Sequence, residues 1–285
     1  MLAAALIVFR EVLEAGLIIG VVMAATEGVA RRGRSIAGGI VAGLLGATLV
    51  ALFAQQISEG FQGSGQALFN AAILVAAVLM LSWHIIWMSR HSRELVRDMK
   101  AMGRQLTTGE ATLAAMATVV AVAVLREGSE VVLFLFGIAA GGESNPLGML
   151  GGGLVGVAGG AVVSLVMYRS LIAIPIGRLF AVTNGLVALL AAGMAGQAGL
   201  LLAQAGLIPT FGDQLWDTSW ILRDDGILGK ALHALVGYSD RPIGVQLAAY
   251  IVVLVGLIAI GRHVRSTSRP VREAAANSAR PLRRG

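Results

Sequence analysis

The chain has 285 residues, of which 56% are hydrophobic and 13% are charged, and its formal net charge is +6. Its mean hydropathy is +0.80. Soluble domains carry roughly 25% charged residues, so this composition excludes an ordinary soluble protein. The sequence contains no cysteine, which excludes disulfide frameworks, thiolate metal sites and cysteine nucleophiles.

Long apolar runs dominate the chain. Five of them are uncharged, and two more are interrupted only by a short charged motif. Each is near or above the ~20 residues that cross a bilayer as a helix, and none shows the alternation typical of membrane strands. The sequence therefore predicts an all-α polytopic membrane protein with seven transmembrane helices. The predicted spans are 2–25, 36–57, 67–89, 111–139, 147–168, 179–204 and 243–262.

The first and fourth predicted spans each contain the motif R-E-x-x-E. The two copies are Arg10, Glu11 and Glu14, and, 116 residues later, Arg126, Glu127 and Glu130. On a helix the two glutamates of each copy share a face, and the arginine lies within ion-pair reach of the second glutamate. Both copies fall near the middle of their spans, where charge is most expensive. Four ionised carboxylates and two arginines leave a formal charge of −2, which a hard cation would relieve.

Glycine-rich patterns in the second and fifth spans extend this repeat. The segment IAGGIVAGLLGA at 36–47 is echoed by LGGGLVGVAGGA at 150–161, and a Leu-Phe pair opens both the third and the sixth span. Three spans therefore repeat as three more, and the second copy enters from the opposite side because three is odd. We expect an inverted 3+3 repeat plus one extra helix, an architecture of transporters whose sites lie near the midplane between the repeats.

The distribution of Lys and Arg predicts the orientation. Loops and the tail on one side hold 17 of the 22 basic residues, so the N-terminus is expected outside and the C-terminus inside. This basic side is expected to face anionic lipid headgroups rather than nucleic acid. The predicted parts are a single permease domain at 1–262, comprising repeat one at about 1–89, repeat two at about 111–204, an outer amphipathic segment at about 205–240 and helix seven at about 243–262, and a basic cytoplasmic tail at 263–285.

Polar residues outside the motifs suggest further sites. Asp213 and Asp217 are i and i+4 in the outer segment, where apolar residues predict a helix lying on the surface. They could collect cations at the entrance or be solvated surface charges. His84 is expected towards the inner end of the third span, as an exit ligand or as a helix-end histidine bonded to backbone or water, the commoner arrangement. The remaining histidines are expected to be solvated in loops or tails: His91, His233 and His263.

The oxygen-only donors of the two motifs favour iron, Ca²⁺, Mg²⁺ or Mn²⁺ over copper, without choosing among them. A purely structural network that pins the first span to the fourth is the alternative, although it needs no surplus carboxylates. An enzyme is not expected, because di-iron carboxylate sites add Glu-x-x-His ligands and no glutamate here has a histidine three positions later.

Paired R-E-x-x-E motifs in spans one and four of a seven-span protein resemble the oxidase-dependent iron permeases, the bacterial EfeU type and its fungal Ftr relatives. The segment LSWHIIWMSR at 81–90 resembles the end of that family's third span, and DTSWIL with GILGKALHALVGYSDRP, within 217–242, resembles its outer segment. The resemblance implies high-affinity import of iron across the cytoplasmic membrane, with iron as the transported substrate and no resident cofactor.

The same resemblance implies that Glu11, Glu14, Glu127 and Glu130 bind the iron. It also implies a periplasmic or extracellular partner protein that binds or oxidises iron. A proton-coupled transporter or exchanger of another hard or divalent cation remains the alternative, since four carboxylates can carry protons as well as metal.

Overall fold

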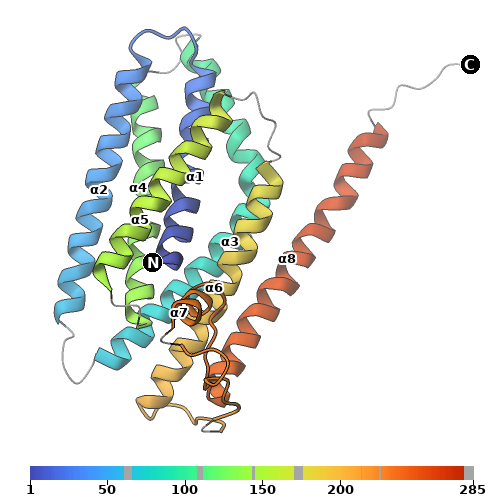
Figure 1. The fold of residues 1–285 in the computed structure, drawn as a ribbon. Coiled ribbons are helices and arrows are strands. Elements are labelled where there is room, and N and C mark those ends of the chain that lie inside the picture. Colours follow the sequence, from blue (N-terminus) through green and yellow to red (C-terminus); the bar gives the residue numbers. More distant parts are fainter. Residues whose placement is uncertain are drawn as a thin grey trace, which may run out of the picture.

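The computed structural model describes residues 1–60, 66–107, 112–142, 145–169, 176–212, 214–224 and 226–278. All the regular elements of these residues are α-helices, which confirms the predicted all-α class. The long helices form an elongated bundle, with the short helix α7 at one end and the last helix leaning away from the bundle (Figure 1). In chain order the helices are α1 Leu2–Ala25, α2 Arg32–Gly60, α3 Gln66–Thr107, α4 Leu113–Ala140, α5 Pro146–Arg169, α6 Ile176–Gln204, α7 Ile227–Val236 and α8 Gly244–Ser278.

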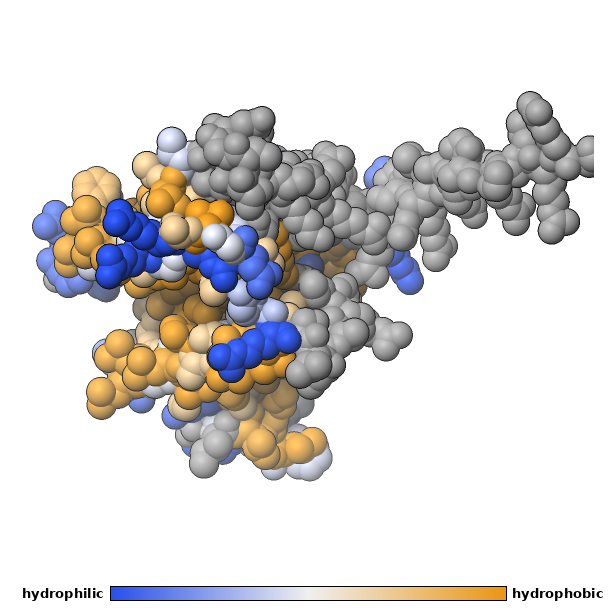
Figure 2. Space-filling view, turned by 90° about the horizontal axis from the view of Figure 1, so that it is seen from above, coloured by the Kyte–Doolittle hydropathy of each residue, from blue (hydrophilic) through white to orange (hydrophobic). Residues whose placement is uncertain are grey.

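The protein is a multi-pass membrane protein by the length and composition of its helices. Seen from above, hydrophobic residues and patches of hydrophilic ones share the described surface (Figure 2). Many large apolar side chains of the long helices are exposed, as expected of helices that face lipid. Helices α1 and α4, of 24 and 28 residues, are also long enough to span, but each carries three charged residues near its middle. The total of seven spans counts these two and stays a prediction. The five segments that qualify without them are Arg32–Gly60, Gln66–Trp87, Pro146–Arg169, Ala181–Gln204 and Gly244–His263.

Glycines let two pairs of helices approach closely. Helix α2 packs mainly on α4, and α5 mainly on α1. A Cβ added at Gly43 of α2 would lie 2.7 Å from the carbonyl oxygen of Ala121, and one at Gly156 of α5 would lie 2.7 Å from that of Ala5. Real Cβ atoms do not come so close to backbone, so only glycine allows these helix backbones to touch.

The two glycine contacts repeat one another residue by residue. In each matched pair, the α5 residue follows its α2 counterpart by 113 positions, and the α4 residue follows its α1 counterpart by 116. In the third matched pair the glycine lies on α4 in one contact, as Gly128, and on α5 in the other, as Gly160. The helices approach closely in both. The matched contacts are Gly43–Val124 with Gly156–Val8, Gly46–Leu125 with Gly159–Phe9, and Ala47–Gly128 with Gly160–Val12.

The two motif-bearing helices run in opposite directions. Ala3, near the start of α1, and Ile138, near the end of α4, line the same cavity. Helix α3 packs against both of them and against α6. The main buried apolar cluster is formed by residues of α1, α3, α4 and α6, with Leu257 added from α8. Charged groups in the middle of α1 and α4 are therefore held inside the bundle, next to α3.

Two predicted segments differ from the structure. The region expected as a basic loop after the third span continues α3 as a helix as far as Thr107, since residues 90–102 hold several good helix formers and no Gly or Pro. The outer segment was expected to be an amphipathic helix, but among its described residues only Ile227–Val236 form a regular helix. Asp217 lies outside that helix, in an irregular stretch, so the prediction of a helical outer segment around it is wrong.

The glycine contacts make a prediction with a control on the same helix. Gly156→Ala places a methyl group against the backbone of α1, so the free energy of unfolding should fall by about 1–3 kcal/mol. Gly153→Ala should be neutral or slightly stabilising, because a Cβ there meets nothing within 4 Å and alanine is the better helix former. The measurement is the melting temperature of the purified protein in detergent. Equal melting temperatures for the two variants would contradict the close packing of α5 on α1.

Candidate metal site

The first motif is fully buried in the middle of α1. Arg10 and Glu11 are each 1% exposed and Glu14 is 3% exposed. The Arg10 guanidinium bridges the two carboxylates, with Nη1 3.2 Å from Glu11 Oε1 and Nη2 3.0 Å from Glu14 Oε1. One planar group thus holds both glutamates in place and offsets part of their repulsion.

The second motif repeats this pairing in a more open setting. Arg126 Nε lies 3.1 Å from Glu130 Oε1 and 4.0 Å from Glu127 Oε1. Both glutamates are buried, whereas the Arg126 side chain is 40% exposed. Its guanidinium lies over the ring of Trp87, 4.5 Å from the ring centre, a cation–π contact that the first motif does not share.

His84 of α3 joins the two motifs. Its Nε2 is 3.0 Å from Glu14 Oε2, and its Nδ1 contacts Glu130 Oε2. The expectation that this histidine is bonded to backbone or water is therefore wrong. Leu74 of α3 and Ala3 of α1 line the same cavity and so lie at a similar depth. Leu74 is in the third turn of α3 and Ala3 in the first turn of α1, so α3 begins about two turns beyond the start of α1. His84 therefore lies at the depth of the glutamates rather than near the inner end of a span.

Four side chains converge on a point that could hold a metal ion. Glu11, His84, Glu127 and Glu130 each offer a donor atom, and these atoms lie within 4.8 Å of one another. In the part of the chain that the structure describes, this is the one such group. Glu11 Oε2 and Glu127 Oε2 are buried without a hydrogen-bond partner among the described residues. Buried unsatisfied oxygens are costly, and a cation between them would satisfy both.

Three of the four predicted glutamates belong to this donor group. Glu14 does not, because its oxygens face Arg10 and His84. Glu14 contacts His84, which is itself a member of the donor group.

Comparison with known proteins identifies the family. The Iron permease FTR1 family matches residues 1–263. The chain belongs to this family. The resemblance inferred from the two motifs is thereby confirmed, and the relatives found are named as permeases, which are transporters rather than enzymes.

Curated relatives of the permease span nearly all of it. It is 29% identical to a protein of Yersinia pestis named "Ferrous iron permease EfeU", over 88% of this chain and 89% of the relative. It is 30% identical to proteins of the same name from Escherichia coli strain 536 and Shigella sonnei strain Ss046, over 88% of this chain and 91% of each relative. No solved structure matches the chain.

The structure describes one of the two predicted entrance residues, Asp217, and its contacts lie within the outer segment rather than at this cluster. Asp213 lies outside the described residues. Asp217 accepts hydrogen bonds from the backbone and hydroxyl of Ser219 at 2.9 and 2.6 Å, and its other oxygen lies 3.1 Å from Arg241 Nε. The Ser219 hydrogen bonds lower the pKa of the Asp217 carboxyl. Both of its oxygens are engaged within the outer segment, so a cation would have to displace Arg241 to bind there.

A cavity of about 40 Å³ lies between the cluster and α7. Gln197 of α6 and His233 of α7 contribute polar side chains to its otherwise mostly apolar lining. His233 was expected to be solvated in a loop, and this is wrong, since it is half-buried in the last turn of α7. The available signal was Gly237, because a glycine after an apolar run is typical of a helix end.

The different settings of the two arginines predict unequal effects on stability. Arg10→Gln leaves Glu11 and Glu14 buried without their shared counter-charge, so the free energy of unfolding should fall by about 3–5 kcal/mol. Arg126→Gln removes a partly exposed partner and should cost about 1 kcal/mol. Arg10→Lys should be intermediate, since lysine cannot make the planar two-toothed contact. Thermal melts of the purified variants test this order, and equal losses at Arg10 and Arg126 would contradict it.

Proposed function

We propose that the protein imports ferrous iron across the cytoplasmic membrane and binds the ion at the buried cluster of R-E-x-x-E glutamates and His84. The observation that carries this proposal is the convergence of four donor atoms within 4.8 Å, inside a chain of the Iron permease FTR1 family. The name of the relatives, ferrous iron permease, supports the oxidation state.

The chemistry of the donors fits ferrous iron. Carboxylate oxygens suit hard cations, whereas an imidazole nitrogen favours transition metals such as Fe²⁺ over Ca²⁺ and Mg²⁺. The four glutamates and two arginines carry a formal charge of −2 when all are ionised and His84 is neutral. A divalent cation brings that sum to zero, which a buried site in an apolar bundle requires.

Glu14 is proposed to act through His84. Metal-binding histidines commonly donate the second ring N–H to a carboxylate, which fixes the ring and its tautomer. With Nε2–H donated to Glu14, the Nδ1 lone pair of His84 is left on the side of Glu130, where the ion would lie. All four predicted glutamates are then part of the site, three as ligands and Glu14 as the residue that positions the histidine.

In this proposal the chain forms an inverted 3+3 repeat with an outer N-terminus, and the ion crosses the membrane between the two repeats. The matched glycine contacts support it, because α2 runs parallel to α4 and α5 parallel to α1, while α1 and α4 are antiparallel. An iron-binding or iron-oxidising partner protein at the outer face is part of this proposal through the family resemblance. The alternative is proton-coupled exchange of another divalent cation, and competition of Ca²⁺, Mn²⁺ and Zn²⁺ with ferrous iron for uptake separates the two.

Substitution of each glutamate tests the site. Glu11→Gln, Glu127→Gln and Glu130→Gln each remove a charged ligand, so ferrous uptake and iron-induced thermal stabilisation should be lost. Glu14→Gln should weaken binding less, by about 10–100-fold, because its amide oxygen can still accept from His84. The matched control is Glu59→Gln, an exposed carboxylate that accepts from Gln55, which should behave as wild type. Normal uptake in all four motif variants would show that the ligand set is wrong.

Cysteine labelling tests the proposed orientation, since the chain has no native cysteine. A cysteine at Gln214, between α6 and α7, should react with a membrane-impermeant maleimide added from outside to intact cells. A cysteine at Glu27, between α1 and α2, should react only after the membrane is opened. Both positions are exposed. The reverse pattern would overturn the orientation while leaving the helix packing intact.

A further inference from the structure

The cavity beside α7 lies further along the two helices that carry the buried cluster, α1 and α4. Ala3 and Ile138 line it, and each is eight residues along its helix from a motif glutamate, Glu11 and Glu130 respectively. At 1.5 Å per residue this places the cavity about 12 Å from the glutamates, towards the N-terminus of α1. A volume of about 40 Å³ has room for a water molecule or a largely dehydrated cation.

His233 presents one ring nitrogen that is free for a ligand. Its Nδ1 lies 2.7 Å from the carbonyl oxygen of Tyr238. A carbonyl oxygen only accepts, so Nδ1 carries the proton and Nε2 keeps its lone pair. The hydrogen bond of the ring to a described residue involves Nδ1 and leaves Nε2 without one, and the histidine lines the cavity. A backbone carbonyl holding the opposite ring N–H is the usual arrangement behind a metal-binding histidine.

The fold fixes this histidine in place. Helix α7 ends at Gly237, whose φ of 70° is left-handed, and Gly237 lies against Gly193 of α6. A Cβ added at Gly193 would come within 2.7 Å of the Gly237 Cα. Two glycines in contact therefore seat α7 on α6 and bring His233 to the cavity.

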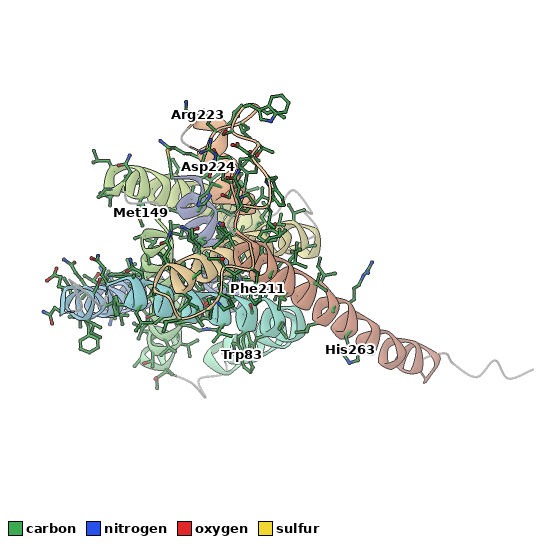
Figure 3. The ribbon with its side chains drawn as sticks, turned by 90° about the horizontal axis from the view of Figure 1, so that it is seen from below. Trp83, Met149, Phe211, Arg223, Asp224 and His263 are labelled. Carbon is green, nitrogen blue, oxygen red and sulfur yellow. The ribbon has the colours of Figure 1, made fainter. Side chains whose placement is uncertain are left out.

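Two further polar groups accompany His233. Gln197 lines the same cavity and has no hydrogen-bond partner among the described residues. Asp224 is close enough for its carboxyl to interact electrostatically with His233, and it is held by a hydrogen bond from the backbone N–H of Asp240 at 3.1 Å. Figure 3 shows Asp224 beside Arg223, well away from Trp83 and His263. A nitrogen donor and an amide oxygen thus line one small space, and a negative charge lies near the nitrogen donor.

An apolar layer separates this space from the glutamates. Ile7 lies between Ala3 and Glu11 along α1, Phe134 between Ile138 and Glu130 along α4, and Leu81 between Leu74 and His84 along α3. All three are at most 1% exposed and belong to the main apolar cluster: Ile7, Leu81 and Phe134. A hydrated ion cannot cross such a layer without a rearrangement, so an ion arriving from the α7 end would be held before it.

We propose that His233 Nε2 and the Gln197 amide oxygen form an outer waiting site for a divalent transition-metal ion, with Asp224 supplying attraction, ahead of the buried cluster. This inference rests on the proposed function, since it names where ferrous iron binds before it crosses the apolar layer. The ion is recognised there by one imidazole nitrogen, neutral oxygens and retained water, which allow it to leave for the glutamates.

Two substitutions at His233 separate ligation from structure. Asparagine can place its amide N–H where Nδ1–H lies and keep the bond to Tyr238, but it has nothing in place of Nε2. Glutamine can place an oxygen near the Nε2 position but loses the bond to Tyr238. In proteoliposomes with radiolabelled iron kept ferrous by ascorbate, His233→Asn should raise the half-saturating iron concentration at least about tenfold. His233→Gln should raise it less, and Lys230→Ala, on the exposed side of α7, should leave it unchanged.

Gln197→Leu provides an independent test, since Gln197 has no hydrogen bond to a described residue that the substitution could break. It should also raise the half-saturating concentration, with its melting temperature unchanged. A larger defect in His233→Gln than in His233→Asn would show that the histidine only holds Tyr238 and would overturn the waiting site. Wild-type uptake by His233→Asn would overturn it as well, whatever Gln197→Leu shows.

The outcomes also distinguish this inference from the proposed function. If wild-type proteoliposomes take up no ferrous iron, or Glu127→Gln takes it up normally, the buried site itself is wrong. If wild type transports iron and Glu127→Gln does not, but His233→Asn matches wild type, only the waiting site is wrong.

Discussion

The burial of four carboxylates in an apolar bundle is the constraint on which the rest of the structure depends. Such groups are tolerated inside a membrane protein only when they face one another, partner charges or a cation. Arg10 bridges two of them, Arg126 pairs with the others, and His84 connects the two sets. The helices that carry these groups must cross closely and in opposite directions, and the remaining helices are arranged to permit this.

Glycine contacts meet that requirement. The stripes on α2 and α5 let each of these helices lie directly on a motif-bearing helix, with the contacts matched residue by residue. The third helices, α3 and α6, differ from one another. Helix α3 contributes His84 to the cluster, whereas the buried positions of α6 include small residues such as Ala191 and Ala195. The two arginines also differ in exposure. A repeated scaffold therefore holds an asymmetric site.

Helix α7, which lies outside the two sets of matched helices, covers one approach to the cluster. Helix α7 covers the end of the bundle where α1 begins, seated by the contact of Gly237 with Gly193. It contributes His233 to the lining of a small cavity, which lies over the apolar layer formed by Ile7, Leu81 and Phe134. Buried apolar side chains thus separate the cavity from the cluster, and an ion entering from this side would reach the glutamates only if that layer opened.

The sequence by itself determined the all-helical membrane class, the family and the residues of the two motifs, because hydropathy and the i, i+3 and i+4 spacing are local properties of one helix. Only the tertiary structure decided that His84 bonds Glu14 and Glu130, since α3 starts about two turns beyond α1 and that offset leaves no trace in local sequence. The same is true of the unequal burial of Arg10 and Arg126 and of the placement of His233 and Gln197 at one cavity. The partner of a side chain is set by which helices cross, at what depth and with what rotation, and these follow from packing over the whole bundle rather than from the order of residues within one span.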